Sequence, residues 1–227
     1  MITPEFTKPE HLGDPYLGAW YVDDAFTQEE ADSVIAEVEG SGKVEPIWDV
    51  PEGSTTQKFR RLTIDMQKEH DFSHVEDLGQ KLANYAVGRA GVLFPKLHEF
   101  RVDEAAVQIY PAGTGLALGW HKDHRDDLYM VISAVLAGSG TVSFTEKTSY
   151  KNATEEDIIA NIHTRALGAV FFRANGLYAR QDESDIRVAH AVTAIDPEED
   201  RFTIQYRMGV NAGNYGNVHV NAENPKR

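Results

Sequence analysis

The segment VQIYPAGTGLALGWHKD, which spans Val107–Asp123, is the stretch that decides the fold. Two runs typical of β-strands, VQIY and LALGW, stand on either side of a turn that contains proline and glycine. The second run leads into His121 and Asp123, and alternation along an extended chain turns residues i and i+2 to the same face. The two side chains would converge on one point, which indicates half of a metal site. By the same alternation, Lys122 and His124 face away. The competing interpretation is a solvated charged turn.

Short strand-like runs continue to about residue 210. Turns rich in Gly, Pro, Asn and Asp separate them, and the runs are EAAVQIYP, LALGWHKD, LYMVISAVLA, GTVSFTE, GAVFFR, VAHAVTAI and RFTIQYRMGV. This texture is typical of a sandwich or jelly roll and not of a parallel sheet with crossover helices. One short helix is expected to interrupt it, in KNATEEDIIANI. The sequence therefore predicts a mainly β, α+β jelly-roll core over residues 100–210.

The first part of the chain carries the clearest helix signals. In TQEEADSVIAEVEG, Thr27 and Glu30 have the spacing of a capping box, and an apolar stripe follows. In SHVEDLGQKLANYAVGRAGVLF, Ser73 and Glu76 repeat that pattern. Between the two helices, EPIWDVPEGSTTQKFRRLTIDM is interpreted as two strands around a loop. We expect one domain over 1–227, with 1–99 as a flank of helices and strands packed on the core and 211–227 as a tail.

Composition excludes several classes of protein. The chain has 227 residues, of which 41% are hydrophobic, and it contains no cysteine, so disulfides, zinc ribbons and thiol nucleophiles are excluded. The N-terminal segment lacks the features of a signal peptide and no apolar run reaches membrane-spanning length, so we expect a cytoplasmic protein. The formal net charge of -14 makes nucleic acid an unlikely partner. A local basic patch could still bind nucleic acid on an acidic protein, and the place to look for one is Lys58, Arg60 and Arg61.

A third metal ligand is available on another strand-like run. His190, in RVAHAV, follows Asp123 by 67 residues, and a closed jelly roll can bring the two together. Two imidazoles and one carboxylate leave three octahedral positions open, which is the arrangement that non-haem Fe(II) oxygenases use. The sequence therefore favours a metal site over a solvated turn.

The run RFTIQYR supplies a candidate anion site. Alternation turns one set of side chains inward and Phe202, Ile204 and Tyr206 to the other side; the inward set is Arg201, Thr203, Gln205 and Arg207. An inward arginine is costly unless an anion meets it, and a guanidinium binds a carboxylate through two parallel hydrogen bonds. A dicarboxylate co-substrate would satisfy Arg201.

The order His121-x-Asp123, His190, Arg201 resembles that of the Fe(II)/2-oxoglutarate-dependent dioxygenase superfamily, in its AlkB-like or small prolyl-hydroxylase-like branch. VQIYPAGTGLALGWHKD, LAGSGTVSF, LGAVFF and RVAHAV are similar to segments of these proteins, and the resemblance covers roughly residues 100–210. It implies a double-stranded β-helix, that is, a jelly roll, with N-terminal supporting helices.

The resemblance also implies roles for individual residues. His121, Asp123 and His190 would ligate Fe(II), while Arg201 would bind the distal carboxylate of 2-oxoglutarate with help from Tyr110. Two further candidates for co-substrate binding are Thr203 and Arg207; the two arginines, six residues apart, are similar to those of the AlkB-like branch.

The implied reaction uses O₂ and 2-oxoglutarate, releases succinate and CO₂, and hydroxylates or otherwise oxidises an unactivated C–H bond. Asp123 argues against the halogenase variants, which lack this carboxylate. A small molecule or an amino acid or peptide is the expected substrate. The alternatives are an AlkB-like oxidative demethylase of a methylated base or side chain, and a non-catalytic metal-binding scaffold. The sequence leaves the substrate, the oxidised position and the oligomeric state open.

One long connection, RANGLYARQDESDIR over residues 173–187, precedes the strand of His190. It is interpreted as a lid over the site, with a solvated loop as the alternative. The candidate substrate contacts in it are Arg173, Asn175, Tyr178 and Arg180.

Overall fold

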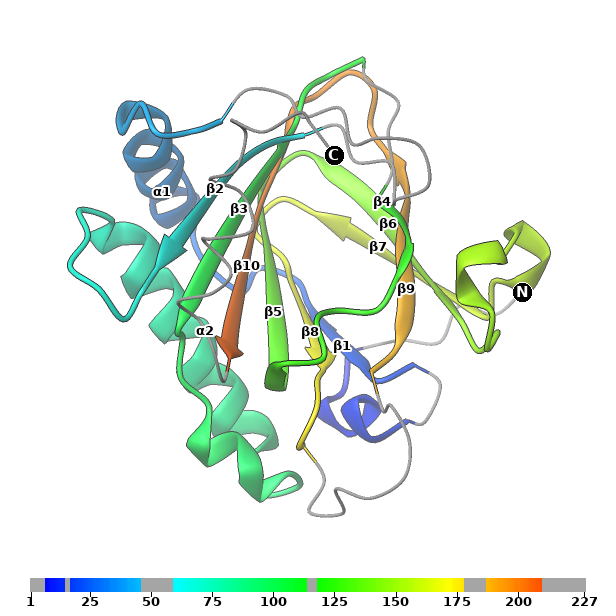
Figure 1. The fold of residues 1–227 in the computed structure, drawn as a ribbon. Coiled ribbons are helices and arrows are strands. Elements are labelled where there is room, and N and C mark those ends of the chain that lie inside the picture. The colour runs from blue at the N-terminus through cyan, green and yellow to red at the C-terminus, as the bar shows by residue number, and fades with distance from the viewer. Residues whose placement is uncertain (1–6, 15–16, 46–58, 114–117, 178–186, 210–227) are drawn as a thin grey trace, which may run out of the picture.

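The computed structural model describes residues 7–14, 17–45, 59–113, 118–177 and 187–209. Two antiparallel sheets dominate it (Figure 1). The larger sheet has the order β1-β8-β5-β10-β3-β2, with bounds β1 (Ala19–Val22), β8 (Ala169–Arg173), β5 (Asp127–Ala137), β10 (Arg201–Gly209), β3 (Glu104–Tyr110) and β2 (Arg60–Asp65). The smaller has the order β4-β9-β6-β7, with bounds β4 (Leu118–His121), β9 (Ala189–Ile195), β6 (Ser139–Thr145) and β7 (Ala160–Arg165). The mainly β class predicted from the sequence is confirmed.

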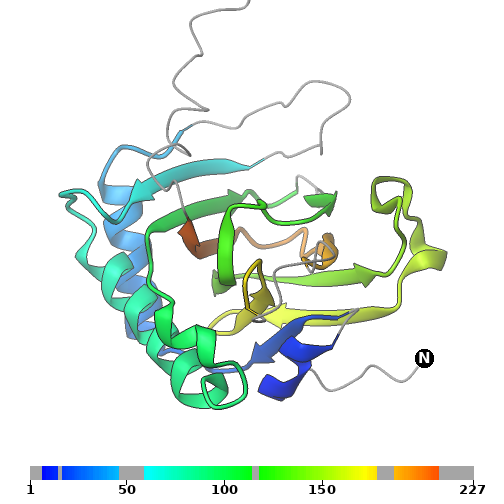
Figure 2. The same cartoon turned by 60° about the horizontal axis from the view of Figure 1, so that its bottom comes forward.

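Two α-helices and four short 3₁₀ helices complete the described part of the chain. Their bounds are η1 (Pro9–Gly13), α1 (Gln28–Gly40), α2 (Ser73–Ala90), η2 (Pro95–Glu99), η3 (Tyr150–Asn152) and η4 (Glu155–Asp157). Both α-helices lie on the outer side of the larger sheet, away from the smaller one (Figure 1, Figure 2). No helix among the described residues has the length and apolar character needed to cross a membrane.

Alternation along β10 separates two kinds of interior. Phe202, Ile204 and Tyr206 join the large apolar core between the sheet and the helices, while Arg201 turns toward the space between the sheets. The Tyr206 hydroxyl donates a hydrogen bond to the Val75 carbonyl oxygen at 3.0 Å and so links the sheet to α2. A second apolar cluster, which includes Val131, Val142, Phe144, Ile162 and Phe172, fills part of the space between the sheets.

The two α-helices begin in different ways. The predicted capping box of α1 is confirmed, because Thr27 Oγ1 accepts from the Glu30 amide at 3.2 Å and Glu30 Oε2 accepts from the Thr27 amide at 2.7 Å. The predicted capping box of α2 is wrong. Ser73 is the first helical residue, the preceding N-cap is Phe72, and no side-chain cap comes from it.

The carboxylate of Glu37, on α1, caps α2 instead. Its oxygens accept hydrogen bonds from the backbone amides of His74 at 3.1 Å and Val75 at 3.0 Å, and from Ser73 Oγ at 3.3 Å. A negative charge at this end also complements the helix dipole. The interaction therefore fixes the start of α2 against α1.

The predicted helix in KNATEEDIIANI is also wrong. The segment forms the short turns η3 and η4, and β7 begins at Ala160. Thr154 and Asp157 form a capping box, but Ala160 and Ile162 bury alternate side chains in the inter-sheet cluster. Burial of Ala160 and Ile162 in a strand therefore outweighs the local helix signal.

Several expectations concern residues outside the described part. They are the first of the two strands expected in EPIWDVPEGSTTQKFRRLTIDM, with the loop after it, over 46–58, and the tail over 211–227. The second expected strand is β2. The single-domain organisation and the division at residue 100 stay predictions.

The cap on α2 can be tested by Glu37→Ala. The variant loses a charged cap that accepts hydrogen bonds from two backbone amides at the start of α2. Its free energy of unfolding, measured by urea denaturation, should therefore be lower by about 1–2 kcal/mol. Glu39→Ala, on the exposed side of the same helix, is the matched control. Equal destabilisation in both variants would show that Glu37 does not act as the cap.

Candidate metal centre and co-substrate pocket

The structure brings His121, Asp123 and His190 together. His121 and His190 are direct cross-strand partners in the β4–β9 pair, with ring centroids 4.3 Å apart. The carboxylate of Asp123 places Oδ1 at 4.0 Å from His121 Nε2 and Oδ2 at 3.9 Å from His190 Nε2. All three potential ligand atoms lie within 4.8 Å of one another. This spacing lets one ion contact all three residues.

Backbone carbonyl groups orient both imidazoles. His121 Nδ1 lies 2.8 Å from the Gly119 carbonyl oxygen, and His190 Nδ1 lies 3.2 Å from that of Val188. A carbonyl oxygen only accepts, so each Nδ1 carries the proton and Nε2 keeps its lone pair. Phe172 stacks on the His190 ring at 4.5 Å and holds its plane. Both Nε2 atoms are therefore directed as ligands.

The electrostatics of the three residues suit a cation. Burial, with a smaller contribution from the neighbouring His190, lowers the pKa of His121 to about 4. Burial alone would raise the pKa of Asp123, but the electrostatic influence of the basic groups His190, His121 and Arg207 outweighs it, and the net shift is downward. At neutral pH the site therefore presents a neutral His121 and an ionised Asp123, which are the forms that bind metal.

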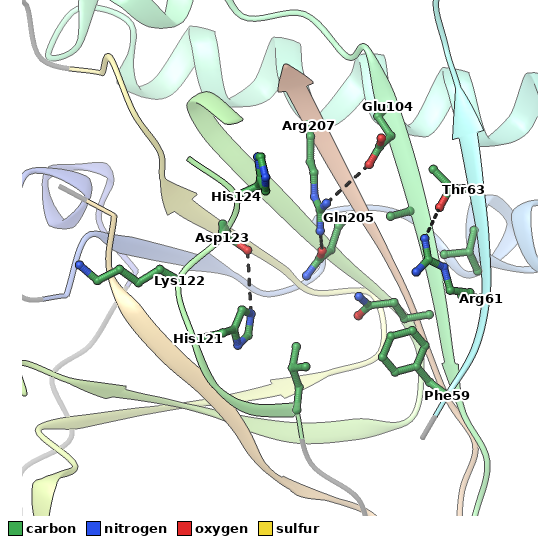
Figure 3. Close-up of a pocket in the computed structure, with 14 residues that line it drawn as sticks. Phe59, Arg61, Thr63, Glu104, His121, Lys122, Asp123, His124, Gln205 and Arg207 are labelled. Atoms are coloured by element: carbon green, nitrogen blue, oxygen red, sulfur yellow. Dashed lines mark hydrogen bonds and ion pairs between the residues drawn. The ribbon is translucent and has the colours of Figure 1, made fainter. Parts of the chain in front are cut away.

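The chain leaves the strand between the two ligands. β4 ends at His121, its pairing with β9 shifts register between Leu118 and His121, and Asp123 lies beyond the strand. Strict alternation therefore does not extend to Lys122 and His124. Both are among the residues that line the pocket, but neither joins the three candidate ligands, and Lys122 extends away from them, with Nζ 5.8 Å from the Tyr150 ring centroid (Figure 3).

Arg201 is a buried cation at the start of β10. The residue is 3% exposed, and Nη2 donates to Thr164 Oγ1 at 3.1 Å, whereas Nε has no hydrogen-bond partner in the described part of the chain. Among the described residues no carboxylate lies within ion-pair distance of it. Burial lowers its pKa, while Tyr110 and Tyr21 favour the charged form. A buried guanidinium with an unsatisfied donor suits a carboxylate ligand.

Two neighbours shape the space around this guanidinium. Tyr110 is the cross-strand partner of Arg201, its ring centroid lies 5.8 Å from Arg201 Cζ, and its hydroxyl donates to Gln108 Oε1 at 3.0 Å. Burial raises the pKa of Tyr110 to about 12, so it remains a hydrogen-bond donor. A Cβ at Gly140 would lie 3.1 Å from Arg201 Nε, so glycine leaves the room that the guanidinium occupies.

Thr203 and Arg207 extend the same inner face of β10. Thr203 Oγ1 donates to the Gln108 carbonyl oxygen at 3.3 Å. Arg207 Nη1 lies 3.5 Å from Glu104 Oε1, and its Nη2 donates to Gln205 Oε1. Arg207 lines the same pocket as His121 and Asp123, so it lies at the metal end of the strand.

A pocket of about 350 Å³ connects the candidate ligands to the opposite wall (Figure 3). Strands β2, β3 and β10 form that wall. The lining residues that sequence reasoning had not assigned to the site include Phe59, Arg61, Thr63, Glu104, Gln108 and Gln205. The sequence indicated only one of them, Gln205, which the alternation in RFTIQYR placed on the inner face of its strand. The others could not be predicted, because their place in the pocket depends on which strands are neighbours in the sheet.

The two predicted substrate contacts that lie among the described residues, Arg173 and Asn175, are not at this pocket. Arg173 is 4% exposed and donates from Nη1 to the carbonyl oxygens of Leu12 at 3.2 Å and Asp14 at 2.7 Å, which ties η1 to β8. Asn175 donates from its side-chain amide to the Arg125 carbonyl oxygen. Neither lines the pocket. Tyr178, Arg180 and most of the expected lid lie outside the described residues, and all these substrate roles stay predictions.

Comparison with known proteins identifies the fold. No family model matches the chain, and no curated protein is similar to it in sequence. A prolyl hydroxylase from Trichoplax adhaerens, in complex with a hypoxia inducible factor oxygen degradation domain peptide fragment, is 13% identical with a TM-score of 0.58, over 91% of this chain and 89% of that one. The viral collagen prolyl hydroxylase of Paramecium Bursaria Chlorella virus-1, as a 2-oxoglutarate complex, is 13% identical with a TM-score of 0.55, over 83% and 94%.

A third similar structure, OsALKBH1, is 11% identical with a TM-score of 0.54, over 84% of this chain and 98% of that one. These neighbours are Fe(II)/2-oxoglutarate oxygenases of the prolyl-hydroxylase and AlkB types. At such low identity the likeness establishes the fold. The chain has the double-stranded β-helix, or jelly roll, of these oxygenases, as the sequence predicted.

The low pKa of His121 gives a direct test of the site's electrostatics. In the metal-free protein its imidazole should stay neutral as the pH falls from 7.5 to about 5 and titrate near 4, as followed by ¹⁵N NMR. Because the unfolded residue titrates near 6.5, the unfolded chain takes up this proton first, so the group lowers stability progressively between pH 6.5 and 4. A native midpoint at or above 6.5 would contradict the described environment.

Proposed function

We propose that the protein is an Fe(II)- and 2-oxoglutarate-dependent dioxygenase that oxidises an unactivated C–H bond of a small molecule, amino acid or peptide. The observation that supports it most is the combination of His121, Asp123 and His190 at one end of the inter-sheet space with the buried Arg201 in the same barrel. The shared fold of the neighbouring oxygenases adds to this support.

Three side chains would hold the iron. His121 and His190 each offer Nε2, and Asp123 offers a carboxylate oxygen. At such a centre, iron, 2-oxoglutarate and dioxygen supply the oxidising chemistry, with succinate and CO₂ as co-products. The chain's own part is to fix both tautomers through backbone carbonyls and to keep Asp123 ionised.

The inner face of β10 would bind the co-substrate. Arg201 would receive the distal carboxylate, and its unsatisfied Nε supplies a donor for that contact. Tyr110 and Thr203 would border the same carboxylate, and Arg207 would lie nearer the metal. Because apolar side chains such as Val142 and Phe172 line the inter-sheet space, they would limit the access of water to the reaction.

An AlkB-like demethylase is the second candidate within the same chemistry. The spacing of Arg201 and Arg207 and the structural similarity to OsALKBH1 favour it. The formal net charge of -14 argues against a nucleic-acid substrate and favours the small-molecule or amino-acid version. The cytoplasmic location stays a prediction.

The proposal is tested by succinate formation from 2-oxoglutarate with Fe(II) and ascorbate, screened across amino acids, peptides and methylated nucleosides. His121→Ala should reduce succinate formation to the level seen without iron, because one of three protein ligands is lost. His74→Ala, on the exposed surface of α2, is the matched control and should behave as the wild type. Unchanged turnover in His121→Ala would refute the site, and no succinate from the wild type would favour a non-catalytic scaffold.

A further inference from the structure

The pocket wall opposite the metal ligands carries a buried carboxylate oxygen that lacks a donor. Glu104, the first residue of β3, is 2% exposed and lines the pocket that contains His121 and Asp123 (Figure 3). Its Oε1 lies 3.5 Å from Arg207 Nη1, whereas its Oε2 has no hydrogen-bond partner in the described part of the chain. A buried acceptor of this kind costs free energy until a donor meets it.

The Glu104 carboxylate needs a hydrogen-bond donor and not a further countercharge. Burial raises its pKa, and the positive charges of Arg207 and Arg61 oppose this shift. A cationic ligand would therefore meet two like charges beside the carboxylate, and an anionic ligand would meet the carboxylate itself. A neutral N–H or O–H group supplies the missing hydrogen bond without either repulsion.

Gln205, on β10, supplies a donor on the same wall. It is 6% exposed, lines the pocket, and accepts a hydrogen bond at Oε1 from Arg207 Nη2 (Figure 3). Because a guanidinium group only donates, the oxygen of the Gln205 amide must face Arg207, and Nε2 is directed away from it. Nε2 stays accessible from the pocket, and no described residue accepts a hydrogen bond from it.

The β3–β10 register holds these two groups next to each other. Glu104 pairs with Arg207 and Ala106 pairs with Gln205, so Glu104 and Gln205 are diagonal neighbours on one face of the sheet. Both side chains also meet the same guanidinium group, Glu104 at Nη1 and Gln205 at Nη2. These two nitrogens belong to one planar fork, so the engaged Arg207 fixes the carboxylate and the amide side by side.

The wall thus presents an acceptor and a donor together to a pocket of about 350 Å³ (Figure 3). The complementary group is an amide edge, by which we mean an N–H donor and a C=O acceptor that point the same way. We propose that Glu104 and Gln205 bind an amide edge of the substrate, whose N–H donates to Glu104 Oε2 and whose carbonyl oxygen accepts from Gln205 Nε2. This inference rests on the proposed function and names the substrate class of the same site.

Two kinds of molecule carry an amide edge. A primary carboxamide has one, and so does a single residue of an extended peptide, as in the paired residues of an antiparallel sheet. Both are neutral, so the formal net charge of -14 opposes neither. In both, the carbon atoms next to the amide edge extend from the wall across the pocket toward His121 and Asp123.

The first experiment measures succinate formation, and binding to the protein loaded with Mn(II) and 2-oxoglutarate, for matched amides and esters. One set contains N-acetyl amino-acid N-methylamides and the depsipeptides in which oxygen replaces the N–H of that residue. The other contains primary carboxamides and their methyl esters. We expect at least one amide to stimulate turnover and its ester to bind at least about tenfold more weakly, because the ester lacks the N–H and places an oxygen against Glu104.

The active set identifies the source of the amide edge, a peptide backbone or a primary carboxamide. Esters that bind as well as their amides, or stimulation only by compounds without an amide, would overturn the inference.

The second experiment uses Gln205→Met and Glu104→Gln with the same pair of compounds. Gln205→Met removes the Nε2 donor, so amide and ester, which both keep the C=O group, should each bind about tenfold more weakly. In Glu104→Gln the new oxygen faces Arg207 and the new nitrogen replaces Oε2. The amide should then bind about tenfold more weakly, because two N–H groups oppose each other, and the ester should not bind more weakly.

Two exposed residues of α2 provide matched controls, Gln80→Met and Glu76→Gln, which should bind both compounds as the wild type does. The affinity for Mn(II) and 2-oxoglutarate should be unchanged in all four variants. If Gln205→Met and Glu104→Gln lose Mn(II) and 2-oxoglutarate binding together with amide binding, the wall is structural and the inference is overturned.

The different responses of amide and ester separate recognition from folding. Equal losses for the two compounds in Glu104→Gln would contradict the assigned contact. If the wild type binds Mn(II) and 2-oxoglutarate but no amide binds or stimulates turnover, the inference fails and the proposed function stands. If the wild type binds neither Mn(II) nor 2-oxoglutarate, both fail.

Discussion

The structure depends on the way that β10 divides its side chains between two environments. This strand lies between β5 and β3 in the larger sheet, so both of its edges are hydrogen-bonded and its two faces meet different surroundings. Phe202, Ile204 and Tyr206 enter the apolar core with the helices, and the opposite face carries polar and charged groups into the space between the sheets. Burial of the apolar face stabilises the position of the strand in the sheet. The arginines on the opposite face are therefore buried between the sheets, where a cation needs an anionic partner.

The smaller sheet meets this polar face with the candidate metal ligands. The β4–β9 pairing sets His121 opposite His190, and the chain then leaves β4 so that Asp123 turns back toward both rings. Carbonyl groups of Gly119 and Val188 orient the rings, and Phe172 stacks on the ring of His190. The candidate ligands therefore come from β4, the segment after it and β9, and the larger sheet faces them across the pocket. Arg201 stands at the start of β10, and Glu104 and Arg61 line the pocket together with His121 and Asp123.

Much of this arrangement follows from local sequence. The spacing of His121 and Asp123 and the alternation in RFTIQYR are short-range patterns, so they predicted both the ligand pair and the inward Arg201. The prediction that His190 joins these ligands needed one further assumption, namely that the strands close into a jelly roll. The cap of α2 by Glu37 could not be predicted in this way, because it joins residues from two helices. The wall formed by Arg61 and Glu104 depends on the order β10-β3-β2, which no local pattern encodes. In KNATEEDIIANI, pairing with β6 decided the outcome against a local helix signal.

The central claim is that the buried Arg201 serves a carboxylate of the co-substrate and not the fold alone. Calorimetric titration of 2-oxoglutarate into the Mn(II)-loaded wild type and the Arg201→Ala variant tests it most directly, with Arg165→Ala, an exposed arginine of β7, as control. We predict that Arg201→Ala weakens 2-oxoglutarate binding by about 30-fold or more, as expected for loss of a buried charged hydrogen-bond partner, while Mn(II) affinity stays the same. Equal losses of Mn(II) and 2-oxoglutarate binding, or unchanged 2-oxoglutarate affinity, would contradict the account.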